Sequence, residues 1–159
     1  MFKVGDMAVY PAQGVGVIEA IESKDIGGQM HDFYVLRIVD GDMTIMVPTA
    51  NVENVGLRSP ILKEKVSGIY DILQEENCLG KVASWSRRQR EYTEKIKTGD
   101  LLEVAEVLRE LYHLKDQKEL SYGEKKFLDQ ARRLLIKEIA VVEGNLEEKV
   151  AERVEGIFH

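Results

Sequence analysis

The segment best suited to ligand contact runs from Ala83 to Tyr92 and holds the only tryptophan of the chain. Trp85 stands between two serines rather than within an apolar stripe, at the predicted start of a helix, and Arg87, Arg88 and Arg90 follow it closely. Arginines bind phosphate oxygens, an indole stacks on or wedges against a base, and a helix N-terminus adds positive potential. The pattern indicates nucleic-acid contact, although an indole packed at a helix corner beside a solvated basic face explains it equally well.

A second aromatic and basic cluster follows Ser121, at the start of another predicted helix. It consists of Tyr122, Lys125, Lys126, Arg132 and Arg133. These side chains could extend the surface around Trp85, or they could form an ordinary solvated helix face.

The distribution of charge matters more than the net charge of −6. Residues 1–60 hold four basic and eight acidic side chains, whereas residues 81–97 hold six basic and two acidic ones, and residues 124–137 hold five and two. Phosphate contact requires clustered cations, so the sequence favours weak or assisted nucleic-acid contact by the second half of the chain.

The first sixty residues are typical of short antiparallel strands. Turn signals at Pro11 to Gly14, Gly27-Gly28 and Asp40-Gly41-Asp42 separate β-branched and aromatic runs. About five strands, the last over Val52–Leu57, predict a small SH3-like or Tudor-like barrel. The strand from Met43 to Pro48 ends at a proline, which is typical of an edge strand that can accept another chain, although a plain barrel strand is the simpler alternative.

From residue 60 onward, apolar residues recur with helical spacing, which predicts a bundle of four or five helices. The fold class is therefore α+β, with domains over residues 1–58 and 59–159. We expect a helix from Val66 to Leu73, a break from Asn77 to Ser84, and a helix from Trp85 to Lys97 that ends at Gly99. Asp100, Ser121 with Glu124, and Asn145 with Glu148 are the predicted caps of the later helices.

The residues of enzyme and metal sites are missing from recognisable patterns. No serine or cysteine lies in a nucleophile motif, Gly14-Val15-Gly16 lacks the third glycine of a nucleotide loop, and three separated histidines with one cysteine, Cys78, form no ligand set. We expect a protein that is not an enzyme and needs no cofactor or metal. Without an apolar span or a signal peptide, it is expected in the cytoplasm.

Short motifs along essentially the whole chain resemble the CarD/CdnL family of bacterial transcription factors that bind RNA polymerase. Those of the first half are Phe2-Lys3-Val4-Gly5-Asp6, Val9-Tyr10-Pro11-x-x-Gly14, Tyr34-Val35-Leu36 and Val47-Pro48. Those of the second half are Trp85-Ser86-Arg87-Arg88, Gly99-Asp100, Val104-Ala105-Glu106-Val107-Leu108-Arg109 and Leu120-Ser121-x-Gly123-Glu124-Lys125. Their order and spacing together make the resemblance specific.

The resemblance implies that the first domain is a Tudor-like module that binds the lobe of the polymerase β subunit. It places Lys24, Leu36, Met46 and Pro48 at that interface. Some family members carry an arginine where this chain has Met46, so an ionic contact there would be replaced by an apolar one.

For the helical domain, the resemblance implies contact with promoter DNA near the −10 element, at the upstream edge of the melted bubble. Trp85 would be a wedge in the minor groove, while Arg87 and Arg88 contact the backbone. A wedge costs less where strands already part, so the protein would favour the open complex without recognising a sequence, and tethering to polymerase would compensate for the small basic patch. We expect a monomer, associated with the nucleoid through RNA polymerase. The main alternative is a polymerase-binding adaptor that does not touch DNA.

Overall fold

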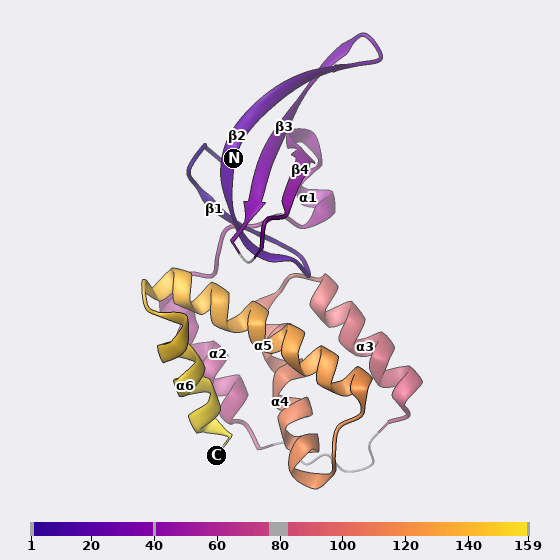
Figure 1. Ribbon diagram of the computed structural model, residues 1–159, viewed down its shortest axis with the longest axis vertical. Coiled ribbons are helices and arrows are strands. Elements are labelled where there is room, and N and C mark those ends of the chain that lie inside the picture. The colour runs from indigo at the N-terminus through magenta and orange to yellow at the C-terminus, as the bar shows by residue number, and fades with distance from the viewer. Residues whose placement is uncertain (1, 40, 77–82, 159) are drawn as a thin grey trace. The chain divides into compact units, whose positions relative to one another are not determined.

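The computed structural model describes residues 2–39, 41–76 and 83–158, which form two compact units, Met1–Pro60 and Ile61–His159 (Figure 1). Part of the predicted turn at Asp40, most of the predicted helix break at Asn77 to Ser84, and both Cys78 and Lys81 lie outside the described residues.

The first unit contains an antiparallel sheet of four sequential strands. They are β1 (Met7–Tyr10), β2 (Gly14–Ile26), β3 (Gln29–Ile38) and β4 (Thr44–Pro48), in the order β1-β2-β3-β4. Gly27 and Gly28 have φ values of 62° and 85°, the left-handed conformation that a tight two-residue hairpin turn requires. Because β2 and β3 are much longer than β1 and β4, their hairpin extends well beyond the two shorter strands (Figure 1).

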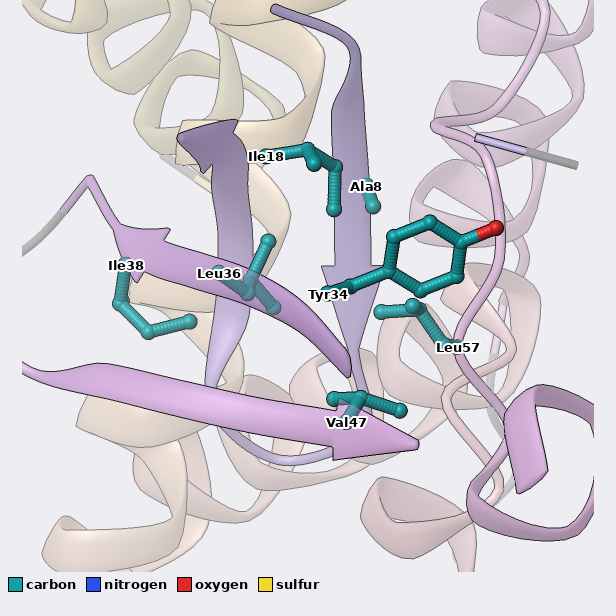
Figure 2. Close-up of a cluster of buried hydrophobic side chains, with 7 residues drawn as sticks. All are labelled: Ala8, Ile18, Tyr34, Leu36, Ile38, Val47 and Leu57. Carbon is teal, nitrogen blue, oxygen red and sulfur yellow. The ribbon is translucent and has the colours of Figure 1, made fainter. Parts of the chain in front are cut away.

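Alternation along the strands divides this sheet into a core face and an outer face. Tyr34, Leu36 and Ile38 on β3 point into the core, where Leu36 is fully buried. Figure 2 shows them with the side chains that complete the cluster, Ala8, Ile18, Val47 and Leu57. Val35 and Arg37 therefore lie on the outer face.

The predicted fifth strand over Val52–Leu57 is wrong. A 3₁₀ turn, Thr49–Asn51, leads into the short helix α1 (Val52–Val55), and Val52 and Val55 pack against the core with the i, i+3 spacing of a helix. After α1, the described chain pairs with β1 at a single residue, Arg58. Val9 N donates to Arg58 O at 2.7 Å, and Arg58 N donates to Val9 O at 3.1 Å. Within the described residues, the sheet curls as a half-barrel of four strands.

The second unit is a bundle of five helices among its described residues, after a 3₁₀ turn at Lys63–Lys65. The helices are α2 (Val66–Gln74), α3 (Trp85–Lys97), α4 (Leu101–Gln117), α5 (Tyr122–Glu143) and α6 (Glu147–Ile157). The long α5 packs against α4 (Figure 1). The buried residues of α4 extend along the helix from Leu101 to Leu114. The predicted α+β class, with a β-module before a helical bundle, is confirmed.

The helix caps confirm two of the three capping predictions. The Asp100 carboxylate accepts from Leu102 N at 2.9 Å, and Ser121 and Glu124 form a reciprocal capping box at the start of α5. The predicted box of Asn145 and Glu148 is wrong, because α6 begins one residue later. Leu146 is its N-cap, and the Asn145 side chain accepts from Leu146 N instead.

Candidate functional site

Trp85 lies at the first turn of α3, where the Ser84 hydroxyl accepts from Arg87 N at 3.4 Å. The buried residues of α3 are Arg88, Tyr92 and Ile96, and Trp85 lies one turn before them on the same face. The prediction that Trp85 stands outside the buried stripe is therefore wrong. The helical spacing of this buried face is hard to recognise in the sequence, because one of its positions is occupied by a charged residue, Arg88.

The indole has a defined seat on α5. Its ring meets Phe127 edge-on, with centroids 6.0 Å apart and planes at 66°, and the Arg88 guanidinium carbon lies 5.3 Å from the ring centroid. A methyl group at Gly123 would lie 2.6 Å from Cζ2 of Trp85, so only glycine permits this close approach. Trp85 as a residue is neither buried nor fully exposed. Its packing on α5 and its partial exposure are therefore both features of the site.

Arg88 is held inside the unit by a buried ion pair. Its Nη1 donates to Glu124 Oε2 at 2.7 Å, its Nε donates to Ala83 O at 3.0 Å, and the two side chains are only 8% and 1% exposed. Because the guanidinium is buried and paired, the structure contradicts the assignment of Arg88 as a phosphate contact. Arg88 instead links the first turn of α3 to Ala83 and to Glu124, close to the indole ring.

Glu124 is the hub of this network. Its Oε1 accepts from Lys118 Nζ at 2.9 Å and from Ser121 N at 2.8 Å, while Oε2 accepts from Arg88. Burial raises the pKa of the Glu124 carboxyl, but the hydrogen bonds from Ser121, Lys118 and Arg88 outweigh burial and lower its pKa to about 2. The carboxylate therefore stays charged at neutral pH.

Exposed cations occur at both helix starts. Arg87, whose side chain is 72% exposed, pairs with Glu91 at 3.1 Å, and Arg90 is also exposed. On α5, Tyr122 is 79% exposed and lies next to Gly123, which contacts the indole. We call the aromatic–basic surface the set formed by Trp85, Arg87, Arg90, Tyr122, Lys125 and Lys126.

Arg132 does not belong to this surface. Its Nε donates to Glu155 Oε1 at 2.7 Å, and the same oxygen accepts from the Tyr112 hydroxyl. Arg132 thus joins α5 to α6, and its side chain stays 37% exposed, so its role as a DNA contact remains a prediction.

The predicted protein-binding residues divide between the two faces of the sheet. Met46, 38% exposed, lies on the outer face, and the Lys24 ammonium approaches its sulfur at 3.6 Å. Pro48 is partly exposed on the same side. Leu36 is fully buried in the core, so its assignment as an interface residue is wrong.

The edge position of β4 leaves backbone groups directed away from the sheet. Ile38 N donates to Met43 O at 2.9 Å, and the pairing continues without a shift through Leu36–Ile45 and Tyr34–Val47. Because hydrogen-bonded pairs alternate in an antiparallel ladder, Thr44 and Met46 direct their amides and carbonyls outward. The predicted edge strand is confirmed as β4, the last strand of the sheet.

Sequence reasoning did not assign Gly123, Phe127 or Lys118 to the site, although Gly123 stands in one of the motifs that carry the resemblance. Glu124 carried the further signal of the capping box, but that motif does not reveal the distant Arg88. The contacts between α3 and α5 join residues about 36 positions apart, as in the Arg88–Glu124 pair.

Gly123→Ala is expected to displace the indole and change the fluorescence of Trp85, the only tryptophan. Gly156→Ala is the matched control, because a methyl group there meets nothing within 4 Å. Both substitutions gain helix propensity, so the Gly123 variant should be less stable than the control by about 1–3 kcal/mol, the usual cost of overpacking. Equal stabilities in urea and unchanged emission would contradict this seat for the indole.

Comparison with known proteins shows matches along both units. The description "CarD-like/TRCF RID domain" matches residues 2–61, and "CarD, C-terminal domain" matches residues 68–155. "Putative transcription factor YdeB" of Bacillus subtilis (strain 168) is 37% identical over 150 residues, which are 94% of this chain and 97% of that protein.

Two solved N-terminal domains from Myxococcus xanthus also match. CdnLNt is 52% identical, with 37% of this chain and 83% of that chain covered, at a TM-score of 0.33. The 72-residue N-terminal domain of CarD, solved by NMR, is 37% identical, with 37% and 79% covered, also at 0.33.

The described residues form a small β-module followed by a helical bundle. With both halves matched, the chain belongs to the CarD family, whose members are transcription regulators and not enzymes. In the part of the chain that the structure describes, no helix combines the length and apolarity needed to cross a membrane, and no three His, Cys, Asp or Glu side chains gather as a metal site.

Proposed function

We propose that this protein binds the lobe of the RNA polymerase β subunit through β4 and stabilises the promoter open complex through its aromatic–basic surface. The observation that carries the DNA part is the partly exposed residue Trp85, whose indole is supported on Gly123 and Phe127 at the start of a helix that also carries the exposed Arg87 and Arg90. A supported indole can insert at a partly unstacked step without losing its orientation.

The inserted indole would act at the upstream edge of the bubble, near the −10 element, without base-specific hydrogen bonds. Unstacking duplex DNA costs a few kcal/mol per step, and this cost falls where the strands have already separated. Trp85 would therefore bind open DNA better than closed DNA and shift the equilibrium toward the open complex. Arg87, Arg90 and Lys126 would supply backbone contacts that carry no sequence information.

Polymerase binding would compensate for the modest charge of the surface. A chain with net charge −6 has little affinity for free DNA, but tethering raises the local DNA concentration to the millimolar range for short linkers. A competitor-challenge assay tests the function directly: adding the protein should lengthen the lifetime of polymerase–promoter complexes, and an unchanged lifetime at saturation would refute the proposal.

Met46→Pro is expected to weaken binding to the β lobe more than Met46→Ala does. Both variants lose the exposed thioether, but only proline removes the outward amide of β4, and it does so without breaking a bond to β3. One backbone hydrogen bond contributes about 0.5–1.5 kcal/mol, so the additional loss should be roughly twofold to tenfold. Calorimetric titration measures it, and equal affinities of the two variants would exclude strand addition at this edge.

An adaptor that binds polymerase without touching DNA is the second candidate. The burial of Arg88 in its pair with Glu124 favours it, because this cation is withdrawn from the surface. In that case the aromatic–basic surface would contact protein, and its substitution would leave open-complex lifetime unchanged.

A further inference from the structure

The core side of the β2–β3 hairpin continues into an open groove, distinct from the outer face that carries Met46. The groove has a volume of about 790 Å³ and lies between the hairpin and the segment 49–54. Phe2, Ile21, Tyr34 and Val52 supply its apolar lining, and the rings of Phe2 and Tyr34 meet edge-on with centroids 5.7 Å apart. Ile21 is 44% exposed there, and Met30, further along the same face, is 65% exposed.

The polar groups of the groove are mainly hydrogen-bond acceptors. Asp32 and Glu53 contribute carboxylates, and the Asn54 amide already donates to Asn51, which leaves its oxygen to accept. Asp32 is held in place by the Ser23 hydroxyl at 2.5 Å. Among the described residues that line the groove, none is cationic.

The two cations of this hairpin lie on the opposite face of the sheet. Lys24 approaches Met46, and Arg37 pairs with Glu19. The groove face therefore combines two carboxylates with an apolar floor and holds no cation of the hairpin, whereas the outer face carries both cations together with Glu19 and Glu22. Asp25, which pairs with Met30 on the groove face, adds a third carboxylate beyond the groove itself.

We propose that this groove binds a segment of another protein in which an arginine or lysine is flanked by aliphatic residues. The aliphatic stem of such a cation can lie along Ile21 and Val52, while its charged head donates to Asp32 and Glu53. Because Ile21 and Met30 are also exposed on this face, an aliphatic side chain next to the cation would add apolar contact. Nucleic acid does not suit the groove, because its phosphates would meet carboxylates.

This binding is separate from strand addition at β4, so one protein could hold two partners at once. Met46→Pro should leave the groove unaffected, and substitutions in the groove should leave binding to the β lobe unchanged. A failure of one proposal is therefore distinguishable from a failure of the other.

The test is an NMR titration of the full-length ¹⁵N-labelled protein with the peptide acetyl-Gly-Leu-Arg-Leu-Gly-amide. We expect saturable shifts of the amides of Ile21, Asp32 and residues 52–54. Replacing arginine with its neutral isostere citrulline should weaken binding about tenfold or more, since a hydrogen bond to a charged group is worth about two to three times a neutral one. Asp32→Asn combined with Glu53→Gln should have the same effect. Glu22→Gln, on the outer face, is the matched control and should leave the affinity unchanged.

Several results would overturn the proposal. These are equal binding of the arginine and citrulline peptides, the absence of saturable shifts, shifts confined to the helical unit, and binding that survives loss of both carboxylates. Groove shifts that appear with rising protein concentration alone would indicate that a second copy of the chain is the occupant.

Discussion

Trp85→Ala is expected to remove most of the protein's effect on open-complex lifetime while leaving polymerase binding intact. Stacking of one base on an aromatic side chain contributes about 1–3 kcal/mol, so the stabilisation should fall roughly fivefold to 150-fold. Trp85→Phe should retain an intermediate effect, because the smaller ring can still stack. Competitor-challenge lifetimes and a parallel binding assay with the β lobe separate the two activities.

The controls for this variant address folding. Trp85 packs on Phe127, so its removal also costs some stability, and unfolding in urea should be measured alongside the lifetimes. Leu102→Ala removes a smaller apolar side chain that is 40% exposed on α4, outside the aromatic–basic surface, and controls for the loss of an exposed apolar group. If Trp85→Ala leaves the lifetime unchanged while polymerase binding persists, the wedge is wrong and the adaptor function gains support.

Glu124→Gln is expected to lower the free energy of unfolding at pH 7 by about 3–5 kcal/mol. Removing the negative charge leaves Arg88 buried without an ionic partner, and breaking one side of a buried pair has this typical cost. Glu91→Gln is the matched control, because its pair with Arg87 is exposed and should contribute no more than about 0.5 kcal/mol. Urea denaturation measures both, and a loss at Glu124 no larger than at Glu91 would contradict the role of the buried pair.

The stability difference between the wild type and Glu124→Gln should also depend on pH. The folded-state pKa of Glu124, about 2, lies below its ordinary value of 4.5, so the carboxylate stabilises the fold above pH 4.5 and loses this contribution as pH falls toward 2. Integrated over that window, the change is on the order of 3 kcal/mol. A stability difference that stays constant from pH 7 to pH 2.5 would show that the carboxylate is not held as its hydrogen bonds indicate.

Local signals predicted much of the fold. The bounds of α3 and the capping box of α5 follow from residues within a few positions of one another, which is why the sequence alone predicts them. The misassigned segment at Val52–Val55 is instructive, because β-branched residues favour strands, while the i, i+3 spacing of two core contacts decided for a helix.

The candidate sites were less predictable because long-range pairing decides which charged groups reach solvent. In the sequence, Arg88 is indistinguishable from the other cations of its basic segment. In the structure it is buried, because it pairs with Glu124, 36 positions away. Leu36 shows a different failure: it alternates with Val35 and Arg37 and shares a face with Tyr34 and Ile38, so its burial follows from period-two spacing. The resemblance had placed it at the interface instead.

Site-specific crosslinking from position 85 tests the central claim most directly. A photoreactive phenylalanine analogue would replace Trp85 in the full-length protein, in complex with polymerase and a promoter labelled on each strand. We predict DNA crosslinks at the upstream edge of the melted region that are absent from the closed complex. Crosslinks to polymerase subunits alone, or to DNA equally in closed and open complexes, would contradict the account.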